Sequence, residues 1–129
     1  MNRFHPYTEL LGRILLAAIF VLSGWSKIGG YAGTQGYMQA AGVPGALLPL
    51  VILLELGGGI AIVLGLFTRW VALALALFSI AAAVLFHGKL GDQMQFVSFF
   101  KNLAMAGGFL LLFTHGAGPL SLDARRAKR

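Results

Sequence analysis

Three ionisable side chains lie inside long apolar stretches of this 129-residue sequence: Arg13, Glu55 and Lys101. A charged side chain at the centre of a bilayer costs about 2.5–3.5 kcal/mol on insertion scales, so such residues usually pair with one another or face a cavity. A carboxylate near two bases can form an intramembrane ion pair, hold a proton or bind a polar ligand. These residues are therefore the first candidates for chemistry in the chain.

The rise of a helix predicts that the three charges lie at similar depths. At about 1.5 Å per residue from the expected outer face, Glu55 lies roughly 15 Å deep, Lys101 roughly 9 Å and Arg13 roughly 21 Å. Both bases would then lie about 6 Å from the carboxylate along the membrane normal. Because Arg and Lys side chains can cover that difference, we expect an intramembrane polar cluster centred on Glu55, with Arg13, Lys27, Lys101 and Asn102 as its other members.

The neighbours of these charges have the spacing expected of such a cluster. Arg13 and Lys27 share one helical stripe, and Asn102 follows Lys101 directly. An asparagine in a membrane helix needs a partner on another helix. Two interpretations stay open: the cluster holds the helices in register, or Glu55 binds a substrate, a quinone or a proton.

Small residues surround Glu55 and predict close approach to a neighbour. Gly58 and Gly59 follow Glu55 by three and four positions, so they share its helix face and leave room for another helix or for a ligand. A second row, at four-residue spacing, is typical of helix packing in membranes; it consists of Gly57, Ala61 and Gly65.

Other kinds of chemistry have little support in the sequence. The chain contains no cysteine, which excludes a protein thiol and a cysteine-ligated cluster. No metal-ligand spacing is present. His87 and His115 are expected at opposite membrane faces, as interfacial residues rather than haem or metal ligands.

The elements that must position these residues are membrane helices. The chain is 58% hydrophobic and 11% charged, which excludes an ordinary soluble domain. Since a helical span needs about 20 apolar residues, we predict one all-α membrane domain over 1–129, an up-down bundle of four transmembrane helices. The spans are expected at about 9–27, 45–67, 69–87 and 95–114, followed by a basic cytoplasmic tail at 120–129. Between the first two spans, residues 28–43 form either a short interfacial helix around 34–41 or a loop with aromatic anchors.

The distribution of Lys and Arg predicts that both termini lie in the cytoplasm. That orientation puts seven of the ten bases inside, among them Arg3, Lys128 and Arg129, and leaves Lys27, Lys89 and Lys101 outside. The basic tail suits an anionic lipid surface, and no basic stripe suggests a nucleic-acid partner.

Four stretches of the chain resemble the DoxX family of small bacterial membrane proteins. They are RILLAAIFVLSGWSKIGG (13–30), GVPGALLPLVILLELGGGIAIVLGLFTR (42–69), FFKNLAMAGGFLLL (99–112) and GAGPLSLD (116–123), in order along nearly the whole sequence. The resemblance implies a four-helix protein of the bacterial inner membrane. The family pattern falls on Arg13, Ser23, Gly24, Lys27, Glu55, Gly58, Arg69, Lys101, Asn102 and Asp123.

The resemblance also implies a role in redox chemistry. Some members of the family are subunits of quinone-linked oxidoreductases, and some of these enzymes oxidise sulfur compounds. Sulfur transfer through a protein thiol is excluded here, since the chain has no cysteine. The leading hypothesis is a membrane component of a redox system that handles a quinone or another small lipophilic substrate, and whether it is itself an enzyme stays open. The alternatives are a small transport or permeation protein and a structural membrane subunit without catalysis. The partners expected are the lipid bilayer and either a second copy or a redox-complex subunit.

Overall fold

The computed structural model describes residues 5–127. Arg3, Lys128 and Arg129, which contributed to the predicted orientation, lie outside the described residues. Every regular element in the described range is a helix, and four helical segments are long and apolar enough to cross a membrane. The predicted all-helical fold with four membrane-length helices is therefore confirmed.

The four long segments alternate with short ones. The first is α1 (His5–Gly29), which is followed by the short helix α2 (Tyr31–Ala40). The second span, Gly45–Leu64, consists of a 3-10 turn η2 (Gly45–Leu47), α3 (Leu48–Ile52), a π-helical turn η3 (Leu53–Gly57) and α4 (Gly58–Leu64). Helices α5 (Thr68–Phe86) and α6 (Gln93–His115) complete the spans, and α7 (Leu122–Ala127) ends the described chain.

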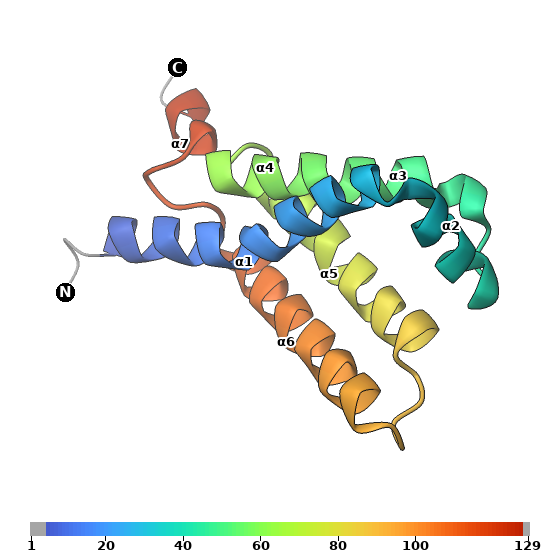
Figure 1. The fold of residues 1–129 in the computed structure, drawn as a ribbon. Helices are drawn as coiled ribbons and strands as arrows, with labels where there is room; N and C mark the ends of the chain where they lie inside the picture. Colours follow the sequence, from blue (N-terminus) through green and yellow to red (C-terminus); the bar gives the residue numbers. More distant parts are fainter. Residues whose placement is uncertain (1–4, 128–129) are drawn as a thin grey trace.

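The long helices pack as two pairs that cross (Figure 1). Helix α1 lies along the second span, and α5 lies along α6. The pairs contact each other through α4 with α5 and through α1 with α6, near the end of the bundle that carries α7. They diverge toward the other end, where α2 projects from the first pair toward the second. We name these the α7 end and the α2 end.

A small core joins the two pairs. The Phe20 ring on α1 packs edge-on against Phe109 on α6, with ring centroids 5.3 Å apart, and against Phe78 on α5 at 6.3 Å. The buried core residues around them come from every span: Ala17, Ile62, Ala72, Leu75, Ala76 and Ala106. Most other apolar side chains of the spans are exposed, as expected of helices whose outer faces meet lipid.

Two glycines set the distance between α1 and the second span. A Cβ atom added to Gly24 would lie 2.8 Å from the backbone nitrogen of Leu56, and one added to Gly59 would lie 2.8 Å from Cγ2 of Val21. The two helices therefore approach more closely than any side chain at these positions would allow, which is how small residues promote packing in membranes.

The predicted packing row of Gly57, Ala61 and Gly65 is only partly right. Gly57 is exposed, and an added Cβ there would meet only Leu53 of its own helix, at 3.7 Å. Gly65 is buried, but it serves a turn: its φ of 71° is left-handed, and it ends α4. The row therefore contributes a turn residue and an exposed position, and the close approach to α1 is made at Gly59.

The described part of the predicted basic tail is docked onto the bundle. The buried guanidinium of Arg13 donates to the carbonyls of Ile62 (3.0 Å) and Val63 (3.2 Å), near the end of α4, and to the carbonyl of Leu120. The last carbonyls of a helix have no partner within it, so a buried cation there satisfies several acceptors at once. Arg13 thereby joins α1, the end of α4 and the segment that leads into α7.

Candidate functional site

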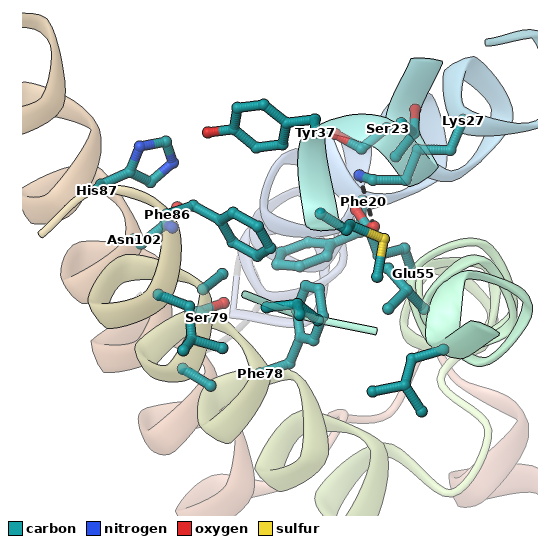
Figure 2. Close-up of a pocket in the computed structure, with 18 of the residues that line it drawn as sticks. Phe20, Ser23, Lys27, Tyr37, Glu55, Phe78, Ser79, Phe86, His87 and Asn102 are labelled. Carbon is teal, nitrogen blue, oxygen red and sulfur yellow. Dashed lines mark ion pairs between the residues drawn. The ribbon is translucent and has the colours of Figure 1, made fainter. Parts of the chain in front are cut away.

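A pocket of about 400 Å³ lies between the two helix pairs, toward the α2 end. Its middle is apolar and aromatic, with Phe20 from α1 and Phe78 and Phe86 from α5 (Figure 2). Polar side chains lie on opposite walls. Lys27 and Glu55 belong to the wall made by the first helix pair, whereas His87 and Asn102 belong to the α5–α6 side.

An ion pair defines the first wall. The ammonium nitrogen of Lys27 lies 2.6 Å from Oε1 of Glu55, and the dashed line in Figure 2 marks this contact. The Glu55 side chain is only 4% exposed, whereas Lys27 is 27% exposed. A carboxylate removed from water in this way depends on its partner, so the two residues form one unit within the bundle.

Local structure on both helices brings Glu55 and Lys27 close together. It sits in the π-helical turn η3, the kind of single widened turn that is often found at functional sites. Gly24 lies three residues before Lys27 on α1 and packs against Leu56, the neighbour of Glu55. The close contact at Gly24 therefore brings the two charged side chains within reach of each other.

Two residues of the predicted cluster, Arg13 and Lys101, do not pair with Glu55 in the structure. Arg13 binds backbone carbonyls toward the α7 end, and Lys101 is exposed on α6 and makes no ion pair with any described residue. The rise along a helix predicts depth, but it carries no information about direction around the helix. Lys27, which lies nearer the end of its helix, is the base that faces Glu55.

Asn102 and His87 line the pocket from the second pair. Asn102, a predicted member of the cluster, lines the same cavity as Glu55, from α6. His87 was expected to be an interfacial residue, and the structure places it in the pocket lining, directly after α5. A signal for this wall exists in the sequence, because Ser79, Ala82 and Phe86 repeat at helical spacing and all line the pocket.

Helix α2 covers the pocket. Of the two structures predicted for residues 28–43, the helix is correct, although it spans Tyr31–Ala40. The Tyr37 ring stacks on Phe86 with centroids 5.3 Å apart and planes inclined by 20°, and Met38 is buried. The Gln35 amide donates to the carbonyl of Gly45 at 3.1 Å, which holds α2 to the start of the second span. Tyr37 and Met38 were missed as pocket residues.

The arrangement suits a small, largely apolar ring with hydrogen-bonding groups. The aromatic middle offers stacking surfaces, and the ion pair offers both a donor and an acceptor. Within residues 5–127, no group of three or more His, Asp or Glu side chains is placed to hold a metal ion.

The chain is similar in sequence to known bacterial proteins. The chain is 50% identical to the inner membrane protein YqjF of Escherichia coli over 123 residues, which cover 95% of each chain. It is 37% identical to the E. coli inner membrane protein YphA, over 93% of this chain and 91% of that one. A Bacillus subtilis protein named "Putative oxidoreductase CatD" is 33% identical over 65% of this chain and 63% of its own length. No solved structure matches.

The sequence model of the DoxX family matches residues 8–88, a range that contains both partners of the ion pair and most of the pocket lining. Together with the two E. coli relatives, this match shows the family of the chain. The chain belongs to the DoxX family and is an inner membrane protein.

Proposed function

We propose that this protein is the membrane component of a redox system and that it binds a quinone, or a related small lipophilic ring, in the pocket between its helix pairs. The observation that carries the proposal is the ion pair between Lys27 and the buried Glu55 on the wall of an aromatic pocket. A cavity of about 400 Å³ falls within the range of small-molecule sites, about 300–1,000 Å³. The oxidoreductase name of the Bacillus relative gives independent support.

The chemistry of a quinone matches these residues. Reduction of a quinone to a quinol takes up two electrons and two protons, and both oxygens change from acceptors to donors of hydrogen bonds. Lys27 can donate to a quinone oxygen, and Glu55 can accept from the quinol hydroxyl that replaces it. In this proposal the chain binds and orients the ring, a redox-complex partner supplies the two electrons, and the two protons come from water.

The shape of the pocket favours binding over permeation. Phe20, which lines the cavity from α1, packs against Phe109 in the buried core. A solute path across the bundle would have to pass through this packed layer. Solute flux through liposomes that contain the protein would favour the transport alternative.

The experiment is quinone binding to the purified protein in lipid nanodiscs. We expect saturable binding of decylubiquinone to the wild type, and binding weakened at least about tenfold in Glu55→Gln. Lys101→Gln is the matched control, because it also removes one charge from a span but lies on the exposed side of α6. A folded wild-type protein that binds no quinone would overturn the proposal and leave the structural-subunit alternative.

A further inference from the structure

The wall opposite the ion pair holds polar side chains that lack partners. Figure 2 shows His87 and Asn102 across the aromatic middle of the pocket from Lys27 and Glu55, with Tyr37 above. Within the described part of the chain, the side chains of His87 and Asn102 make no hydrogen bond, and neither does the Tyr37 hydroxyl. By contrast Ser79, on the same wall, donates to the carbonyl of Leu75 at 2.8 Å.

Unused hydrogen-bonding capacity is unexpected at Asn102. Its side chain is half-buried on a membrane helix, where an amide group without a partner is unfavourable and normally bonds across helices. The antiparallel partner α5 contributes Ser79, Ala82 and Phe86 to the same wall, none of which bonds this amide. A ligand in the pocket would give Asn102 the partner that the protein does not.

We infer that the wall formed by His87 and Asn102, with Tyr37 above it, is a second polar subsite, and that the ligand carries an oxygen at each of two opposite ends of one ring, as a para-quinone does. The inference rests on the proposed function and narrows its substrate class. Lys27 and Glu55 bind one oxygen of the ring, and Asn102 and His87 bind the other.

The chemistry of the second subsite suits both redox states of such a ring. The asparagine amide and the neutral imidazole each contain a donor and an acceptor. They can therefore donate to a quinone carbonyl and accept from a quinol hydroxyl. A ring with one oxygen would form hydrogen bonds with the polar side chains of only one wall. The pocket should therefore bind such a ring more weakly than a ring with two oxygens.

The test compares two ligands with the same decyl tail, decylubiquinone and 4-decylphenol, on the protein in nanodiscs. We expect the wild type to bind the quinone about tenfold more tightly than the phenol, because one further hydrogen bond is made within the pocket. Asn102→Leu should lose most of this preference by weakening quinone binding, with phenol binding changed less than about twofold. His115→Leu, which alters a histidine outside the pocket lining, should keep the preference.

A conservative variant separates hydrogen bonding from packing. Asn102→Gln keeps the amide and should retain much of the quinone preference, while helical circular dichroism confirms that each variant is folded. Equal binding of both ligands by the wild type would overturn the second subsite and leave the proposed function intact. The same holds if Asn102→Leu, when folded, keeps the full preference. Failure of both ligands to bind the wild type would refute the proposed function and the subsite with it.

Discussion

The carboxylate of Asp123 accepts a hydrogen bond of 2.8 Å from the backbone nitrogen of Thr68, the first residue of α5 and 55 positions away in the chain. Its other oxygen accepts from the nitrogen of Phe67 at 2.7 Å, and the Asp123 nitrogen donates to the carbonyl of Gly65. Helix α5 has no capping side chain of its own, since Phe67 precedes it in a left-handed conformation. The C-terminal segment therefore supplies the cap that the turn between α4 and α5 lacks.

Replacement of Asp123 by Ala should destabilise the protein by about 1 kcal/mol, the usual effect of losing an N-terminal cap. The free energy of unfolding in detergent measures this, with Arg125→Ala as a control on the exposed side of α7. An unchanged midpoint for Asp123→Ala would show that the docked segment does not stabilise α5.

The same contact predicts a pH dependence. Burial acts to raise the pKa of Asp123, but the hydrogen bonds from Thr68 and Phe67 and the charge of Arg126 outweigh it and hold the pKa below its ordinary value of 3.8. A lowered pKa in the folded state means that the carboxylate stabilises the protein above pH 3.8 and that this contribution is lost as the pH falls below it. The stability difference between wild type and Asp123→Asn should therefore be constant near neutral pH and shrink in acid. A difference that grows on acidification would have the wrong sign.

The ion pair in the pocket predicts energetic coupling between Lys27 and Glu55. Glu55→Gln leaves Lys27 without its partner, and loss of one member of a buried pair typically costs about 3–5 kcal/mol. Because Lys27 is 27% exposed, we expect a loss at or below the lower end of that range. The double variant Lys27→Gln/Glu55→Gln should recover part of it in a thermodynamic cycle. The parallel cycles with Arg13 and with Lys101 should show less coupling, and stronger coupling in either would contradict the observed pair.

Two glycines of the first helix pair should respond in opposite ways to the same substitution. Gly24→Ala places a Cβ 2.8 Å from the Leu56 backbone, so the helices must separate, and we expect a loss of about 1–3 kcal/mol. Gly57→Ala meets only Leu53 at 3.7 Å and should be neutral or stabilise by up to about 1 kcal/mol, since alanine is the better helix former. Thermal unfolding in detergent distinguishes them. Equal effects at both positions would mean that the close approach is not where the structure places it.

The orientation in the membrane remains a prediction from charge alone. If both termini are cytoplasmic, alkaline phosphatase fused after residue 129 should be inactive, whereas a fusion at Gly91, between α5 and α6, should be active. The reverse pattern would place the α2 end of the pocket on the cytoplasmic side and would change the compartment from which a ligand or partner approaches.

The sequence by itself determined three properties of the protein: that its long helices are apolar enough for a lipid bilayer, how many such helices there are, and which family the chain resembles. Each of these depends on local properties: the length of an apolar run, the positions of Gly and Pro, and short motifs read in order. Glu55 could be nominated in the same way, because an ionisable residue near the middle of a span is unusual wherever the helix points.

Only the tertiary structure decided which residues meet. The helix rise gives depth, but contact also depends on the direction around each helix and on the angle between helices. The π-helical turn at Glu55 changes that direction locally, and the divergence of the two pairs opens the pocket near Lys27 while Arg13 is bound at the other end. Tyr37 reaches the same cavity as His87 only because α2 folds across it, a long-range arrangement that no periodicity within a single helix encodes.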